Sequence, residues 1–193
     1  MATTRDIVQT ATCNSCHGAT SDVKLALHGG GRTDVEYCVT CHNPYTTDAN
    51  SGNTVDFPVM VHKIHAGATL ANGYTIYGFG NTAHDYSTVG FVADLDNCTR
   101  CHSGGGSEEA AWRVPNREAC GSCHDNVDFA TGANHGSGGV QTTNAFCQNC
   151  HPATGPITAS LLPVATVHKG LARNAEAALY AGASNGFLIE DIS

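Results

Sequence analysis

The chain has 193 residues, of which only 13% are charged, with 22 glycines, one tryptophan and a formal net charge of −8. An acidic chain is a poor partner for nucleic acid, and no stretch of about 18 apolar residues is present to span a membrane. The shortage of large apolar side chains predicts one domain with a thin protein core and less regular secondary structure than an average globular protein has.

The N-terminal half is predicted to contain one helix among loops. Residues 1–12 are interpreted as a lead-in linker or short strand, and the three glycines within 25–32 mark a tight backbone path. A polar loop follows at 43–54. Phe57–Ala66 is predicted to be a short helix, with a proline near its first turn. Residues 66–97 form a long stretch that contains glycine and tyrosine but no cysteine.

The C-terminal half is predicted to consist mainly of loops. Two glycine-rich stretches, 103–107 and 135–139, are expected to shape the backbone around bound groups rather than to link domains. Residues 13–185 are assigned to one domain. The apolar segment in 186–193 has the pattern of a strand that begins at the end of the chain. We interpret it as the stub of a following β-domain, which makes the chain an excised fragment.

All ten cysteines belong to five copies of the pattern Cys-x-x-Cys-His, the attachment motif of c-type haem. The two thiols can add across the two vinyl groups of one porphyrin, and the adjacent imidazole can reach its iron. Zinc is disfavoured because five pairs do not divide into four-cysteine sites, and a disulfide framework would not place histidine after every second cysteine. The sequence therefore predicts five covalently attached haem c. The motif residues are Cys13, Cys16, His17, Cys38, Cys41, His42, Cys98, Cys101, His102, Cys120, Cys123, His124, Cys147, Cys150 and His151.

Six histidines lie outside the motifs, and a six-coordinate iron needs one further axial ligand at each haem. Methionine cannot supply them all, because only Met1 and Met60 are present. We therefore predict two histidines at every iron. His84, in a polar setting beside an aspartate, is left out of the ligand set, and its assignment stays open. The second ligands are predicted to be His28, His62, His65, His135 and His168.

His62 and His65 are spaced three residues apart, which places them on neighbouring parts of one helix face. One imidazole binds one iron, so this pair is predicted to serve two haems and to hold them close together. A lone histidine pair on a helix more often combines a surface residue with a core residue. The need for five axial ligands favours ligation here.

The stretch Leu27-His-Gly-Gly-Gly-Arg-Thr-Asp-Val-Glu-Tyr-Cys-Val-Thr-Cys-His-Asn-Pro44 and the segment 59–67 resemble the outer-membrane multihaem cytochromes of metal-reducing bacteria, the OmcA/MtrC family. The resemblance extends over nearly the whole chain. It implies a pentahaem c-type cytochrome domain, packed around haem, mostly irregular, with short α-helices and little β-structure. It also implies that the chain is the first of two pentahaem domains in a longer protein. The five second ligands that the resemblance implies are those proposed above.

The predicted function is electron transfer through five haems with low potentials, since histidine at both axial positions gives a lower potential than histidine with methionine. The resemblance implies extracellular acceptors, namely Fe(III) or Mn oxides, chelated metals or flavins, with other cytochromes or an outer-membrane conduit as partners. It implies export, followed by placement at the cell surface or outer membrane as part of a larger protein, or in the periplasm. A periplasmic pentahaem carrier and a nitrite or hydroxylamine-type oxidoreductase are the alternatives. Electron transfer is favoured over catalysis, and metal reduction at exposed haems stays open.

Overall fold

The computed structural model describes residues 5–18, 25–103 and 105–168. Short helices separated by irregular segments make up most of this part of the chain. The α-helices are α1 (Thr10–Asn14), α2 (Val35–Cys38), α3 (Phe57–Ala66), α4 (Arg117–Cys123), α5 (Cys147–Cys150) and α6 (Val164–Val167). Single 3₁₀ turns lie at η1 (Gly67–Thr69), η2 (Phe79–Asn81), η3 (Cys98–Arg100), η4 (Glu109–Arg113) and η5 (Gly136–Gly138). The prediction of a mostly irregular fold with short helices and little β-structure is confirmed.

Helix α3 is the longest helix described and spans Phe57–Ala66, as predicted. Pro58 lies in its first turn, where a missing backbone N–H leaves no intrahelical hydrogen bond unmade. The buried side of α3 carries Met60, which packs with Val55 and Tyr74 in the main apolar cluster. Tyr74 is 2% exposed and donates its hydroxyl hydrogen to the Thr54 carbonyl at 2.8 Å. Met60 thus serves as packing material.

The only β-sheet in the described ranges is a two-stranded hairpin that the sequence did not predict. Strands β1 (Thr75–Tyr77) and β2 (Ala83–Asp85) pair in antiparallel register, with Ile76 opposite His84. The connection between them contains two left-handed residues, Gly80 and Asn81, which suit a tight turn. The hairpin lies within the segment 66–97, which contains no cysteine.

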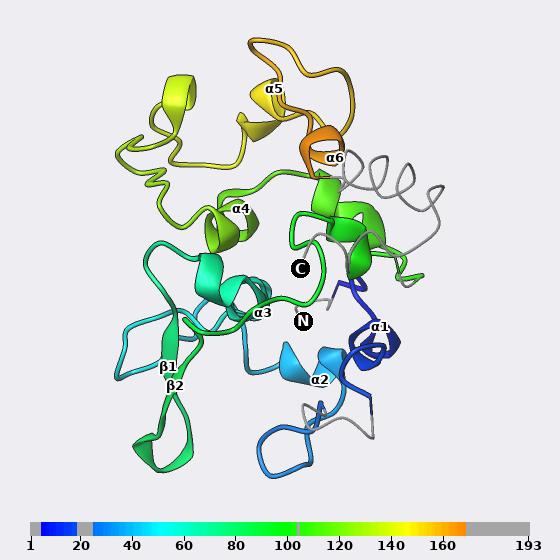
Figure 1. The fold of residues 1–193 in the computed structure, drawn as a ribbon, viewed down its shortest axis with the longest axis vertical. Helices are drawn as coiled ribbons and strands as arrows, with labels where there is room; N and C mark the ends of the chain where they lie inside the picture. The colour runs from blue at the N-terminus through cyan, green and yellow to red at the C-terminus, as the bar shows by residue number, and fades with distance from the viewer. Residues whose placement is uncertain (1–4, 19–24, 104, 169–193) are drawn as a thin grey trace, which may run out of the picture.

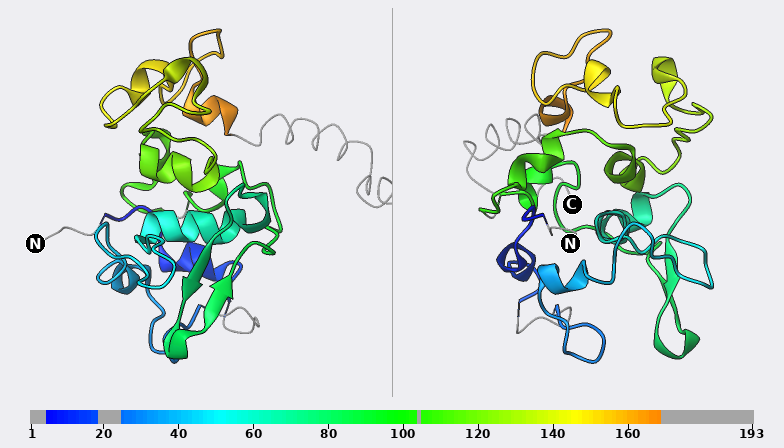
Figure 2. Two further views of the ribbon diagram at one scale, coloured as in Figure 1. Left: turned by 90° about the vertical axis from the view of Figure 1, so that its left-hand side faces the viewer. Right: turned by 180° about the vertical axis from the view of Figure 1, so that it is seen from behind.

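The helices follow one another along the long axis of the molecule (Figures 1 and 2). Helices α1 and α2 lie towards one end, α3 is near the middle and packs against α4, and α5 and α6 form the opposite end. The order of the helices along this axis thus broadly follows their order in the sequence. This arrangement places the cysteine motifs along the length of the molecule.

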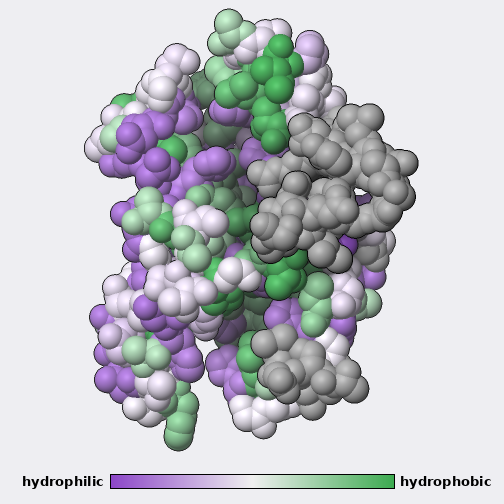
Figure 3. Space-filling model, viewed as in Figure 1, coloured by the Kyte–Doolittle hydropathy of each residue, from purple (hydrophilic) through white to green (hydrophobic). Residues whose placement is uncertain are grey.

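The surface combines polar stretches with exposed apolar side chains (Figure 3). Apolar residues gather at the end of the molecule where α5 and α6 lie, and Phe146, Ile157 and Leu162 of that region are exposed. No helix in the described ranges is long and apolar enough to cross a membrane.

The first described residues pack against the region after η3. Glu108 N donates to the Asp6 carbonyl, the Asp6 carboxylate accepts from Ser107 N, both at 2.8 Å, and Arg5 pairs with Glu108. Residues 5–9 are irregular, and α1 begins at Thr10, inside the segment 1–12 interpreted as a lead-in. The predicted β-domain stub at 186–193 lies outside the described residues, and the boundaries of the predicted domain 13–185 stay predictions.

Replacing Met60 by alanine should lower the free energy of unfolding by about 2–5 kcal/mol, because it leaves a cavity in the apolar cluster beneath α3. Chemical denaturation of the haem-loaded protein would measure the change. Val92→Ala is the matched control, since Val92 is 90% exposed, and should change stability by less than about 0.5 kcal/mol. Equal losses in the two variants would contradict the assignment of Met60 to the core.

Candidate haem-binding sites

Each cysteine motif forms one helical turn that ends at its histidine. In all five motifs, the backbone N–H of the histidine donates to the carbonyl of the first cysteine, at 2.9 or 3.0 Å. A hydrogen bond between residues i and i+4 places residues i, i+3 and i+4 on one side of the turn. Both thiols and the imidazole of a motif can therefore reach the same bound group. We number the motifs and their sites 1 to 5 in chain order.

The structure brings every motif histidine opposite one of the five predicted second ligands. The ring centroids in these pairs are separated by 5.9 to 6.4 Å. The pairs are His17 with His65 at site 1, His42 with His28 at site 2, His102 with His62 at site 3, His124 with His168 at site 4, and His151 with His135 at site 5.

This spacing fits one metal ion between two imidazoles. A histidine nitrogen binds a metal at about 2 Å and lies about 1 Å from its ring centroid, so two opposed imidazoles have centroids about 6 Å apart. Direct stacking would bring the rings closer together. In the described residues, no group of three or more His, Cys, Asp or Glu side chains could hold a metal ion. The side chains present at each motif, two thiols and a facing imidazole pair, fit an iron porphyrin.

Backbone carbonyls fix the orientation of five of these imidazoles. A carbonyl oxygen only accepts, so the Nδ1 atom that faces it carries the proton and Nε2 keeps a lone pair for a metal. The contacts join His42 to Val55, His65 to Val61, His135 to Gly139, His151 to Leu162 and His168 to Val164, at 2.8 to 3.2 Å. Backbone carbonyls have no sequence signature, so the sequence could not predict this set.

Site 3 differs from the other sites. The Nδ1 atoms of His62 and His102 are both buried and have no hydrogen-bond partner in the described part of the chain. The Pro58 carbonyl, one helical turn before His62, acts to raise the pKa of His62 but does not meet hydrogen-bond geometry with Nδ1. Burial nevertheless lowers the pKa of His62, and burial and the neighbouring His62 lower that of His102 to about 4. Both imidazoles are therefore neutral near pH 7.

Burial also keeps the thiols of the central motifs protonated when no thioether is present. It raises the pKa of Cys98 to about 11, with a smaller contribution from the thiol of Cys123. Burial likewise raises the pKa of Cys120 and of Cys123. All ten cysteines are free of disulfides, as expected of residues that are available for haem attachment.

His84 has no histidine opposite it. It lies on β2 with an exposed side chain, and its ring covers Gly78 across the hairpin turn. A Cβ atom at Gly78 would lie 2.6 Å from His84 Nε2, so a side chain at this position would displace the exposed His84 ring. A similar close approach occurs in the glycine-rich stretch 135–139, where a Cβ atom at Gly138 would lie 2.5 Å from the His135 ring.

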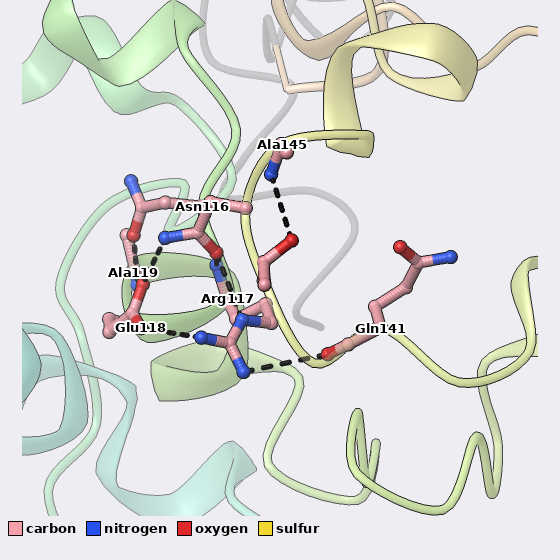
Figure 4. A network of polar contacts seen from close by, with 8 residues as sticks. Asn116, Arg117, Glu118, Ala119, Gln141 and Ala145 are labelled. Carbon is pink, nitrogen blue, oxygen red and sulfur yellow. Dashed lines mark hydrogen bonds and ion pairs between the residues drawn. The ribbon is translucent and has the colours of Figure 1, made fainter.

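A polar network joins site 4 to the segment that leads into site 5 (Figure 4). The backbone N and Nε of Arg117 both donate to Asn144 Oδ1 at 3.0 Å, and Asn144 Nδ2 donates to Glu118 at 2.8 Å. The Asn116 side chain caps α4 by accepting from Ala119 N at 2.8 Å. Asn144 lies three residues before Cys147, so the network sets the position of motif 5 relative to α4.

Asn144→Ala should lower the free energy of unfolding by about 1–2 kcal/mol, because it leaves Arg117 and Glu118 without their shared partner. Hydrogen exchange at residues 144–147 should become faster. Thr143→Ala is the control, since Thr143 accepts only one long contact from Ala145 N at 3.4 Å. Unchanged exchange in the Asn144 variant would show that the network does not hold this segment.

A polar clamp at Asp125 fixes the loop after α3 to motif 4. The Asp125 carboxylate accepts from the backbone N–H groups of Ala71 and Asn72, both at 2.8 Å. The Asp125 carbonyl accepts from the Asn72 side chain at 2.7 Å. Asp125 directly follows His124, so α3 and site 4 are held together by more than apolar packing.

Comparison with known proteins identifies the family. The model of a family described as outer membrane cytochrome MtrC/MtrF-like, domains II/IV, matches residues 5–169. The chain belongs to this family. Among curated MtrC/MtrF-like relatives, the multiheme cytochrome MtrC of Shewanella baltica (strain OS185) is 34% identical over 153 residues, which are 76% of this chain and 18% of that protein. The predicted resemblance to outer-membrane multihaem cytochromes is confirmed.

Solved structures of MtrC/MtrF-like cytochromes share the fold. The outer membrane decaheme cytochrome OmcA gives a TM-score of 0.66 at 30% identity, over 89% of this chain and 25% of that one. MtrC from Shewanella baltica OS185 gives 0.55 at 29% identity, over 92% of this chain and 22% of that one. The chain spans about a quarter of the length of these relatives, or less. As a member of this family, the chain is a domain of the outer-membrane multihaem cytochrome type.

Proposed function

We propose that this chain binds five haem c groups, each attached to one motif and held between two histidines, and that it conducts electrons along its length. The observation that carries the proposal is the pairing of all five motif histidines with five other histidines at 5.9 to 6.4 Å. When bound, haem c supplies an iron centre that takes up and releases one electron. The pairs named above are the proposed axial ligands.

The chain's own residues give the sites rigid positions. Two cysteines of each motif would hold the porphyrin covalently, and both imidazoles would occupy the axial positions and leave none for a substrate. Backbone carbonyls hold five of the ten rings in the tautomer that ligation needs. Filled axial positions at every site favour electron transfer over an oxidoreductase that binds nitrite or hydroxylamine at iron.

Contacts between motifs support the spatial order 2, 1, 3, 4, 5. Besides burial, the thiols of Cys101 and Cys38 raise the pKa of Cys13, which makes site 1 a neighbour of sites 3 and 2. Helix α3 carries one ligand for site 1 and one for site 3, a single helical turn apart. Sites 2 and 5 would then be the two ends of the conductor, in keeping with the positions of α2 and α5 (Figure 1).

The same kind of contact links the second half of the order. Besides burial, the thiol of Cys123 raises the pKa of Cys98, which links site 3 to site 4. Burial and then the charges of His168 and His151 lower the pKa of His124, which links site 4 to site 5.

We further propose that the domain works at the cell surface or outer membrane within a longer protein. Its partners would be other cytochromes or an outer-membrane conduit, and its acceptors Fe(III) or Mn oxides, chelated metals or flavins. Family membership supports this placement. The family model describes both domain II and domain IV of the longer proteins. It therefore fits the predicted first haem domain and a later haem domain equally well.

Intact mass and magnetic spectroscopy test the proposal. The haem-loaded chain should gain the mass of five haems and retain no free thiol, and its oxidised form should show only low-spin iron. A different haem count would refute the proposed stoichiometry. A high-spin component that binds nitrite or carbon monoxide would instead favour the oxidoreductase.

A further inference from the structure

We propose that His62 and His102 give site 3 the highest reduction potential of the five sites, because neither imidazole donates a hydrogen bond from Nδ1. The inference rests on the proposed ligation by two histidines. It concerns the tuning of one site by the residues around it rather than the presence of haem.

The hydrogen-bond pattern sets site 3 apart. Sites 1, 2 and 4 each contain at least one ring that donates Nδ1–H to a backbone carbonyl, and at site 5 both rings do so. At site 3 neither ring does, although both Nδ1 atoms are shielded from water in the described structure. Both atoms are buried, so solvent cannot replace the missing acceptor.

A hydrogen bond from Nδ1 makes an imidazole a stronger electron donor to its metal. Stronger donation stabilises ferric iron over ferrous iron and so lowers the reduction potential. Two imidazoles without such a bond donate less, and the potential of their site should rise.

Burial acts in the same direction. Ferric iron between two neutral imidazoles carries more positive charge than ferrous iron, and removal from water penalises the more charged state. The burial of the His62 and His102 Nδ1 atoms at site 3 would therefore disfavour the ferric state.

Two nearby charges oppose each other at this site. Arg100 directly precedes Cys101, so its positive charge lies near site 3 and favours the ferrous state. Asp96 lies two residues before Cys98, and its negative charge favours the ferric state. Because these effects have opposite signs, the missing hydrogen bonds and burial set the direction.

A potentiometric titration of the unaltered protein and of the variants His62→Met and His168→Met tests the inference. Dithionite reduces the oxidised protein stepwise while optical and paramagnetic resonance spectra follow each low-spin component. The unaltered protein has one low-spin haem signal, from a haem with two histidine ligands, that disappears first on reduction. In His62→Met this signal should be absent from the oxidised protein. A component with the sulfur-to-iron band of methionine ligation should replace it at a still higher potential.

His168→Met is the matched control, because His168 donates Nδ1–H to Val164 at 3.1 Å. In this variant the first-reduced histidine–histidine component should persist, and a lower component should disappear. Persistence of the first component in His62→Met, or its loss in His168→Met, would overturn the inference. If neither variant gained methionine ligation, the proposed ligand set itself would be wrong, which is a separate failure.

Deletion of whole sites provides a second route if His62→Met does not load fully. Cys98→Ser with Cys101→Ser removes attachment at site 3, and the first-reduced component should vanish. Cys38→Ser with Cys41→Ser removes attachment at site 2, and the component should remain. The opposite pattern would place the highest potential elsewhere.

Discussion

Replacing His168 by alanine is expected to convert one of five haems from low-spin to high-spin. The His168 ring lies 6.1 Å from that of His124, and its Nδ1 donates to the Val164 carbonyl, so Nε2 is the nitrogen available to iron. Alanine removes the axial ligand and leaves an open position. About one fifth of the oxidised haem signal should acquire high-spin character, and carbon monoxide should bind to the reduced protein.

His84→Ala is the matched control, since His84 is an exposed histidine on β2 with no imidazole opposite it. Its spectrum should match that of the unaltered protein. A high-spin signal in His84→Ala would show that His84 is a ligand and that the set of second ligands is wrong. A fully low-spin His168→Ala protein would remove His168 from that set.

The chain produced without haem attachment is expected to lack a cooperative fold. The buried apolar side chains in the described residues are few and mostly surround α3, and they cannot offset the entropy of ordering so many irregular segments. They are Val55, Val59, Met60, Ala66, Tyr74, Val164 and Ala165. Circular dichroism should show no sharp thermal transition, whereas the haem-loaded protein should show one.

Partial loss of haem should have a graded effect. Cys98→Ser with Cys101→Ser should lower the melting temperature more than Cys38→Ser with Cys41→Ser does. Site 3 adjoins the core helix α3 through His62, whereas the site 2 ligand His28 is exposed. A sharp transition in the chain without any haem, near that of the loaded protein, would show that protein packing alone specifies the fold.

The sequence predicted the helix at Phe57–Ala66 because its signal is local. A proline at a first helical turn needs no knowledge of tertiary structure. The hairpin of β1 and β2 was missed because each strand has only three residues, too few for an alternating pattern. Local patterns thus define the elements but not the shorter pairings.

The assignment of second ligands to particular motifs lay beyond sequence reasoning. His65 faces His17, 48 residues earlier, and His62 faces His102, 40 residues later. Neither pairing follows the order of the motifs. The clamp at Asp125 and the network around Asn144 were equally hidden, because isolated polar residues in loops have many alternative roles. The choice of His28, His62, His65, His135 and His168 as ligands remains a prediction that the ring pairs support.

The placement of His62 and His65 on one helix has a consequence for how this domain can change length during evolution or engineering. An extra residue between them would turn one ring by about 100° relative to the other, and no adjustment within α3 could restore both pairings. Insertions in exposed loops, by contrast, displace only the loop. We expect α3 to reject every insertion or deletion between its two histidines, while the tip of the hairpin at Phe79, which is fully exposed, should accept an inserted peptide label.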